Sequence, residues 1–278
     1  MSVLMMGFVP VLIFGIDANE ATIGFARLAI GSFGIALLMM ARREFRQISR
    51  RELFWLASLG IMFAVHWYLY FWSIKRAGAA LAAIAVCTFG IHLLLVNRVA
   101  YGDTIRRIDL CAVAIAIGGV IIATPFHADS FEQGIGFIVG VFSGFLYACL
   151  PPINRQIAHL PTNFRALGQF GFGFIGFLFL WPLTEWQTLQ QHDWYGLLAL
   201  GVVCTIGAHT LWNKVSTELP GNLTAVISYL YIPLAMLLSA LFLDEAITWQ
   251  MVAGATLIIT ANLLVALTPK AKSALSDP

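Results

Sequence analysis

The stretch 66–72, HWYLYFW, holds one imidazole, two phenols and two indoles within seven residues. On a helix, His66 and Tyr70 share one face and Trp67 lies on the next, because residues four apart are neighbours. Such a wall can stack on a flat ligand and hydrogen-bond its polar groups. The alternative is an aromatic belt at a membrane–water boundary, where Trp and Tyr gather. The depth of His66, roughly 20 Å from the start of its apolar run, favours the wall.

Aromatic and imidazole side chains recur in three later apolar runs. His209 and Trp212 lie close together in the run 194–213, Tyr147 lies in 134–154 and Tyr229 in 220–243. A polar group placed within a bilayer usually faces the interior of a helix bundle. We therefore expect one cavity wall built from these candidate substrate-binding residues: His66, Trp67, Tyr70, Tyr147, His209, Trp212 and Tyr229.

Three further residues introduce a bend or a charge into these runs. Pro152 near the end of one run and Pro233 within another lack the N–H that a helix needs, so both are candidate hinges. A plain helix end is the alternative for Pro152. Arg27 lies a few residues inside its run, where it can hold a carboxylate or extend to the membrane surface. The sequence leaves both roles of Arg27 open.

Sixty per cent of the 278 residues are hydrophobic and only 11% are charged. Soluble domains are about half apolar and a quarter charged, so we predict a multi-pass protein of the inner (plasma) membrane, surrounded by the lipid bilayer. The net charge of +2 is too small to indicate a nucleic-acid partner. The four cysteines fall in apolar runs without CxxC or Cys/His spacing, so we expect buried thiols rather than disulfides or metal ligands.

The hydropathy pattern predicts an all-α integral membrane protein with ten transmembrane helices. The apolar segments are 3–16, 21–41, 53–74, 78–99, 107–125, 134–154, 163–183, 194–213, 220–243 and 247–268. A bilayer core of about 30 Å needs about 20 residues of helix, so the first segment is too short to cross it.

The basic residues predict the orientation of the chain. With a cytoplasmic N-terminus, the inner connections hold 13 of the 16 Lys and Arg residues, and the outer connections hold only Lys75 and Arg76. Cytoplasmic loops of membrane proteins carry an excess of Lys and Arg. We therefore expect both the N- and the C-terminus in the cytoplasm.

The chain is similar to itself at a shift of 142 residues, which needs no gap and aligns the segment boundaries. The shift pairs Pro10 with Pro152 and brings His209 to within one residue of the counterpart of His66. Each half holds five segments, an odd number, so the second half must enter the membrane from the opposite side. This pattern predicts two inverted five-helix repeats, 1–127 and 128–278, with a substrate site near the midplane, as in many secondary transporters.

The repeat also bears on the short first segment. Its partner in the second half begins near Gly134, which maps about eight residues before Met1. We therefore expect the first helix to be incomplete at its N-terminal end.

Motifs of other protein classes are absent or misplaced. The sequence GFGFIG at 171–176 has the spacing of a dinucleotide fingerprint, but it lies within an apolar run, so close helix packing explains it better. Gly136, Gly140 and Gly144 have a similar packing spacing. The sequence offers no Walker A motif, HExxH, GxSxG or deep carboxylate pair. We therefore expect no ATP, no cofactor, no metal and no enzyme activity.

Every Asp and Glu falls at a segment end or in a loop. Proton-coupled carriers often bury a carboxylate that relays protons, so this pattern favours facilitated transport or exchange. Coupling through His66 or His209 stays open, because imidazoles titrate near neutral pH.

The chain resembles the drug/metabolite transporter superfamily, in its ten-helix EamA branch. The resemblance is carried by 231–266, YIPLAMLLSALFLDEAITWQMVAGATLIITANLLVA, with the family's Pro in the ninth helix, Glu245 at its end and Gly254 in the tenth. Residues 83–122 are a weaker copy, with Ile91 and Asp103 where the family has Pro and Glu. Arg27 is similar to the family's Arg early in helix two. The resemblance implies helices around a central cavity, with the fifth and tenth at the periphery.

Together these observations predict a secondary transporter that moves a small, largely aromatic metabolite by alternating access. Within the EamA branch, the stretch 66–72 is similar to that of exporters of aromatic amino acids, which implies these substrates and export as the direction. The alternatives are another solute in the same fold, such as a nucleobase, a cationic drug or another amino acid, and proton antiport.

Overall fold

The computed structural model describes residues 1–44, 46–125, 130–209, 211–212 and 227–268. Every regular element in these ranges is helical, as predicted. Up to residue 125 the helices are α1 (Ser2–Gly15), α2 (Glu20–Ala41), α3 (Arg50–Ala77), α4 (Ala79–Val86), α5 (Phe89–Tyr101) and α6 (Arg107–Ala123). From residue 130 they are α7 (Phe131–Arg155), α8 (Thr162–Leu178), η2 (Trp181–Leu183), η3 (Trp186–Thr188), α9 (Gln191–Leu198), η4 (Ala199–Gly207), α12 (Tyr231–Leu243) and α13 (Trp249–Leu267).

Several of these helices are long and apolar enough to cross a membrane. Within the described ranges there are five: α2, α3, α4 with α5, α7 and α13. The bent pair of α8 and Trp181–Thr188 makes a sixth candidate, and α1 and Ile227–Leu243 are shorter apolar helices. The chain is thus a multi-pass membrane protein, and the count of ten stays a prediction. The predicted segments that include 210, 213 or 220–226 lie partly outside the described residues.

Large apolar side chains cover the outside of the bundle. Phe33 on α2, Val99 on α5 and Phe242 on α12 are among the exposed ones. A soluble monomer rarely leaves a large apolar surface uncovered, whereas lipid covers such a surface in a membrane. Cys111 on α6 is also exposed and Cys149 is half-buried, so the expectation of buried thiols is wrong for these two. An apolar run alone does not distinguish a lipid-facing side from a buried one.

The buried carboxylates of the described residues stand at helix starts. Glu52, Asp109 and Asp193 are the third residues of α3, α6 and α9. Each accepts the backbone N–H of the residue before its helix at 2.8 Å. A carboxylate in this place satisfies an N–H that the helix leaves unpaired and interacts favourably with the helix dipole. These acids therefore fix where helices begin and do not reach the middle of the bundle.

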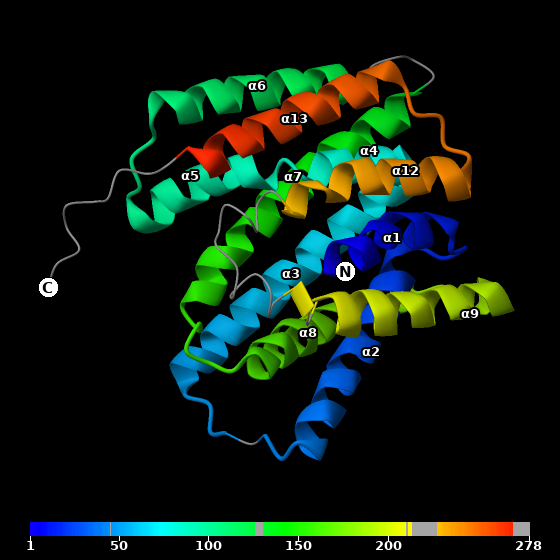
Figure 1. Cartoon of the computed structure of the whole chain (residues 1–278). Coiled ribbons are helices and arrows are strands. Elements are labelled where there is room, and N and C mark those ends of the chain that lie inside the picture. Colours follow the sequence, from blue (N-terminus) through cyan, green and yellow to red (C-terminus); the bar gives the residue numbers. More distant parts are fainter. Residues whose placement is uncertain (45, 126–129, 210, 213–226, 269–278) are drawn as a thin grey trace, which may run out of the picture.

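The helices of the two halves interleave. α3 lies against α7 and α8, α2 against α8 and η4, α1 against α12, and α6 against α13. Figure 1 shows α6 and α13 side by side along one edge of the molecule. This is the peripheral position that the family resemblance implies for the fifth and tenth segments.

Glycines let the backbones of the two halves approach closely. A Cβ at Gly136 of α7 would lie 2.8 Å from the backbone nitrogen of Ala77, and one at Gly144 would lie 2.8 Å from the carbonyl oxygen of Val86. The predicted packing role of the α7 glycines is confirmed.

The motif GFGFIG lies within α8 and is only partly a packing motif. A Cβ at Gly173 would lie 3.3 Å from the carbonyl oxygen of Gly60 on α3. A Cβ at Gly171 would meet nothing within 4 Å. Gly173 therefore serves the close approach of α8 to α3, whereas Gly171 tolerates a side chain.

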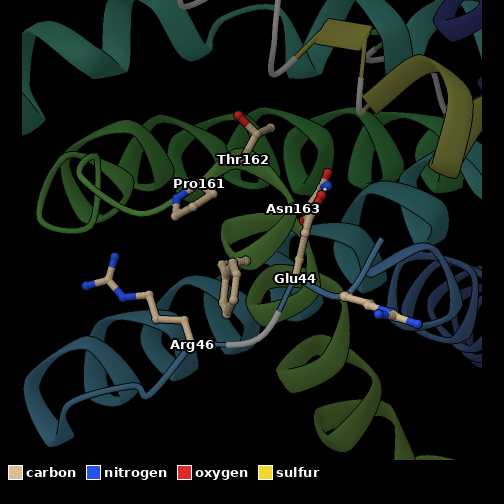
Figure 2. Close-up of a pocket in the computed structure, with 7 residues that line it drawn as sticks. Glu44, Arg46, Pro161, Thr162 and Asn163 are labelled. Atoms are coloured by element: carbon tan, nitrogen blue, oxygen red, sulfur yellow. Dashed lines mark hydrogen bonds between the residues drawn. The ribbon is translucent and has the colours of Figure 1, made fainter. Parts of the chain in front are cut away.

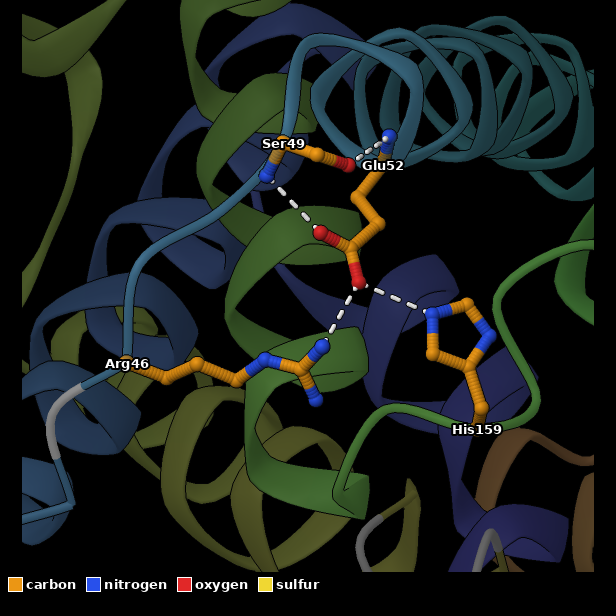
Figure 3. A network of polar contacts seen from close by, with 4 residues as sticks. All are labelled: Arg46, Ser49, Glu52 and His159. Atoms are coloured by element: carbon orange, nitrogen blue, oxygen red, sulfur yellow. Dashed lines mark hydrogen bonds and ion pairs between the residues drawn. The ribbon is translucent and has the colours of Figure 1, made fainter.

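Polar contacts join the two halves at both ends of the bundle. At the expected cytoplasmic end, Glu52 accepts from Arg46 at 2.9 Å and bonds His159, between α7 and α8, at 2.8 Å (Figure 3). At the other end of α3, the backbone N–H of Asp17 donates to Asp193 at 2.8 Å. The middle of the bundle lies between these two sets of contacts.

Replacing Gly144 with Ala should destabilise the protein, because the added methyl group meets backbone atoms of Val86 that cannot move aside cheaply. We expect the free energy of unfolding in detergent to fall by about 1–3 kcal/mol. Gly171→Ala is the matched control, since the same change there meets open space. Equal unfolding midpoints for the two variants would contradict the packing role of Gly144.

Candidate functional site

A chain of rings runs through the middle of the bundle around His66. The centroid of the His66 ring lies 4.9 Å from that of Tyr147 on α7 and 6.0 Å from that of Tyr70, with which it is nearly parallel. On its other side the Phe63 ring lies 6.2 Å away and leads to Trp67 at 4.4 Å. Rings from both halves of the chain therefore meet.

His209 and Tyr229 extend this chain from the second half. The ring of His209 lies 5.8 Å from that of Trp67. Tyr229 stacks on Phe89 at 5.9 Å, and Phe89 lies 5.0 Å from Tyr147. The ring cluster, as we call it, consists of Phe63, His66, Trp67, Tyr70, Phe89, Tyr147, His209 and Tyr229.

The structure places six of the seven predicted binding residues in the ring cluster. Trp212 is the exception: it is half-buried and makes no ring contact with the described residues. His66, Trp67 and Tyr70 are only 4%, 3% and 6% exposed. These three side chains face other helices and not lipid, which argues against the aromatic-belt interpretation of 66–72.

Ser143 fixes the orientation of the His66 ring. Nδ1 of His66 lies 3.0 Å from the carbonyl oxygen of Ser143 and 2.8 Å from its hydroxyl. The carbonyl can only accept, so Nδ1 carries the hydrogen, and the ring in its neutral form presents Nε2 as an acceptor. Nε2 makes no hydrogen bond within the described ranges. It is therefore available to a donor such as an ammonium group.

A hydroxyl pair joins α3 to α12. The phenol oxygens of Tyr70 and Tyr231 lie 2.5 Å apart, although the residues are 161 positions apart in the sequence. One phenol donates and the other accepts. The pair links the ring cluster, through Tyr70, to α12.

Arg27 lies beside the ring cluster and is 1% exposed. Its guanidinium carbon lies 4.0 Å from the ring centroid of Trp67 and 5.2 Å from that of Phe71. Nε donates to the hydroxyl of Thr205 at 3.2 Å, and Nη1 has no hydrogen-bond partner. No carboxylate of the described residues pairs with it. The side chain is thus enclosed by the bundle and does not extend to the membrane surface.

The partner of Arg27 comes from a π-helix, η4. In this segment the Thr205 hydroxyl donates to the carbonyl oxygen of Leu200, five residues earlier, at 2.8 Å. π-Helical turns are rare and occur frequently at functional sites. The wider helix places Thr205 against α2, where Gly31 leaves room for its methyl group.

The two candidate hinge prolines lie within helices. Pro152 stands near the end of α7, which continues to Arg155. Pro233 is the third residue of α12, and the regular helix is interrupted just before it, at Leu230. The position four residues before Pro233 is Tyr229, whose carbonyl oxygen loses its helical donor. The break thus lies next to the ring cluster, and the hinge role of both prolines stays a prediction.

A surface pocket lies away from the ring cluster, at the expected cytoplasmic end. It is lined by Arg43, Glu44, Arg46, Pro161, Thr162, Asn163 and Phe164 (Figure 2). Across it Asn163 donates to Glu44 at 2.8 Å. Three of its seven lining residues are charged, and it shares no residue with the ring cluster. We therefore assign no substrate to it.

Some members of the site escape sequence reasoning. Phe63, Phe89 and Tyr231 join the site only through packing across helices. Tyr231 lies in the stretch 231–266 that carries the family resemblance, two residues before Pro233. This position was the only signal for it in the sequence. Nothing in the sequence connects Thr205 with Arg27, 178 positions away.

The sequence matches the EamA-like transporter family over residues 1–124 and 134–267. It is 22% identical over 263 residues to a probable amino-acid metabolite efflux pump of Escherichia coli, covering 86% of this chain and 88% of that protein. It is 25% identical over 171 residues to a probable biotin transporter of Pseudomonas aeruginosa, covering 58% of this chain and 59% of that protein.

Two further comparisons extend over most of the chain. An uncharacterized transporter of Archaeoglobus fulgidus is 27% identical over 265 residues, covering 90% of this chain and 85% of that protein. One solved crystal structure superposes with a TM-score of 0.68 at 18% identity, covering 96% of this chain and 94% of the other. At this identity the superposition shows a shared fold alone.

Tyr70→Phe and Tyr231→Phe should each destabilise the protein, because each leaves the opposite hydroxyl without its partner. We expect about 1 kcal/mol for each single variant and little more for the double variant, since removing both hydroxyls leaves no buried polar group unpaired. Chemical unfolding in detergent measures all three. Additive losses in the double variant would contradict the hydroxyl pair.

Proposed function

The chain belongs to the EamA-like transporter family and is a multi-pass membrane transporter, and we propose that it exports small aromatic metabolites, aromatic amino acids foremost, across the inner (plasma) membrane. The family and the relatives carry the names of transporters and not of enzymes. The relative named as an amino-acid metabolite efflux pump supports the direction and the substrate class.

The observation that carries this proposal is the ring cluster. His66 and Tyr70 come from the first half of the chain, and Tyr147, His209 and Tyr229 come from the second. Stacked aromatic pairs contribute about 0.5–1.5 kcal/mol each beyond the burial of their area, so a flat ring that enters the cluster is held by several faces. A buried wall of this kind suits an aromatic solute better than a small polar ion.

The helix boundaries support the proposed pair of repeats. Adding the shift of 142 to the first residues of α2 and α6, 20 and 107, gives 162 and 249, the first residues of α8 and α13. The packing supports these repeats too. Exchanging the halves turns the contact of α3 with α8 into that of η4 with α2, and the contact of α5 with α7 into that of α12 with α1. The two segments that match the family lie on either side of the proposed boundary near 127.

Two inverted halves around one site can alternate between opening to either side of the membrane. In this protein the contacts of Glu52 with His159 and of Asp17 with Asp193 join the halves at opposite ends. Alternating access then requires one set to separate while the other stays closed. The helix interruption before Pro233 is where we expect α12 to bend during this step.

The proposed transport is facilitative. Within the described ranges the buried carboxylates cap helices, so none of them stands at mid-depth to relay protons. Proton antiport through His66 or His209 is the alternative, and the same fold can also carry a nucleobase, a cationic drug or another amino acid. The relative named as a biotin transporter makes biotin a further competitor to test.

The proposal is tested by counterflow of radiolabelled phenylalanine in liposomes that carry the purified protein, without an ion gradient. We expect label to enter vesicles preloaded with phenylalanine and excess tryptophan to block its entry. Flux that appears only with a pH gradient would overturn the facilitative mechanism and keep the substrate. If phenylalanine shows no flux under either condition, while the protein transports another solute and nucleobases or biotin block that transport, the proposed substrate class is wrong.

His66→Ala should weaken transport without abolishing membrane insertion. Losing one stacking face and one hydrogen bond, together about 1.4 kcal/mol, should lower counterflow at low phenylalanine about tenfold. Tyr195→Ala is the control, because Tyr195 is 62% exposed and lies outside the ring cluster. Counterflow of His66→Ala at the normal rate would contradict a binding role for His66.

A further inference from the structure

Arg27 is deeply buried, and no acidic side chain among the described residues pairs with it. Arg46 pairs with Glu52 at 2.9 Å, and Arg106 pairs with Asp109 at 2.7 Å. Arg76 pairs with Glu20 at 3.6 Å near the membrane surface. Arg27 is the one that is almost fully enclosed, at 1% exposure. Charged side chains within a bilayer are costly, and they usually mark sites of function.

The surroundings of Arg27 stabilise its charge without neutralising it. The face of Trp67 lies 4.0 Å from the guanidinium carbon, and such cation–π contacts are worth about 2 kcal/mol when desolvated. Thr205 accepts from Nε at 3.2 Å and occupies one edge of the fork. The terminal nitrogen Nη1 is left without a partner. A positive charge and an unused donor therefore point to an acceptor that arrives from outside the chain.

We propose that Arg27 binds the carboxylate of the transported solute. The guanidinium is planar and presents paired N–H groups that match the two oxygens of a carboxylate. Trp67 covers its face, so an anion has to approach along its edge, where Nη1 lies. This inference rests on the proposed function and narrows it to solutes that carry a carboxylate next to an aromatic ring.

The position of Arg27 beside the ring cluster fits a solute that carries a carboxylate near an aromatic ring. Trp67, which stacks on Arg27, belongs to the ring cluster, and its ring lies 5.8 Å from that of His209. With the carboxylate at Arg27, the aromatic ring of the solute lies among the rings next to Trp67. A cationic drug is disfavoured, because an unpaired positive charge in a low-dielectric site repels it.

The test compares phenylalanine with phenylalaninamide, which has the same ring and ammonium group but no carboxylate. Both are used as unlabelled competitors of labelled phenylalanine in the counterflow assay. For the wild type we expect phenylalanine to compete about tenfold better or more, since a charge-assisted bond is lost with the amide. In Arg27→Gln the two compounds should compete equally well to within about twofold, because only phenylalanine has a carboxylate that loses its partner.

Arg76→Gln is the matched control, because Arg76 also stacks on a tryptophan, Trp72 at 3.8 Å, but lies at the end of α3 with an acidic partner. It should keep the full preference for phenylalanine. Arg27→Lys keeps the charge and loses the paired donors, so an intermediate preference is expected. Undiminished preference in Arg27→Gln, or equal competition by both compounds in the wild type, would overturn the role of Arg27.

A binding measurement separates this inference from the proposed function and does not depend on transport. 3-Phenylpropionate, which has a ring and a carboxylate but no ammonium group, should raise the unfolding temperature of the wild type in detergent, and 3-phenylpropanol should not. Arg27→Lys should show a smaller shift, and Arg27→Gln none. If phenylalanine is not transported while this pattern holds, the proposed function fails and the carboxylate site stands. If phenylalanine is transported but 3-phenylpropionate does not raise the unfolding temperature, only the proposed carboxylate site is wrong.

Discussion

Moving a guanidinium from water into a membrane-spanning bundle costs several kcal/mol unless the group is paired. Among the described residues, the enclosed Arg27 has the hydroxyl of Thr205 as its hydrogen-bond partner and the face of Trp67 as its nearest ring. The surrounding structure has to hold both partners in place. Trp67 comes from α3 and Thr205 from η4, so the charge lies where the two halves of the chain meet.

The packing of the bundle keeps these side chains in position. Close contacts at Gly136 and Gly144 bring α7 against α3 and α4, which places Ser143 next to His66. Carboxylates at the starts of α3, α6 and α9 fix where those helices begin. With these three acidic groups at helix starts, the described residues in the middle of the bundle are chiefly rings, the imidazoles of His66 and His209, and the cation of Arg27. That composition is the basis for proposing an aromatic solute with a negative group.

The sequence predicted the features that depend on local spacing. It identified the stretch 66–72, the α7 glycines and the acids at segment ends, because apolar periodicity and residue size are visible along the chain. It did not reveal the pairing of Tyr70 with Tyr231 or of Arg27 with Thr205, because these contacts join segments 161 and 178 positions apart. Nor could it show that Cys111 faces outward, since a lipid-facing side and a buried side of a helix are both apolar.

The most direct measurement of this account is a structure of the protein in a lipid nanodisc with phenylalanine bound. We expect the phenylalanine ring among the side chains of the ring cluster and its carboxylate within hydrogen-bond distance of Nη1 of Arg27. Phenylalanine bound instead in the surface pocket lined by Arg43, Glu44 and Phe164, with Arg27 still unpaired, would contradict this expectation.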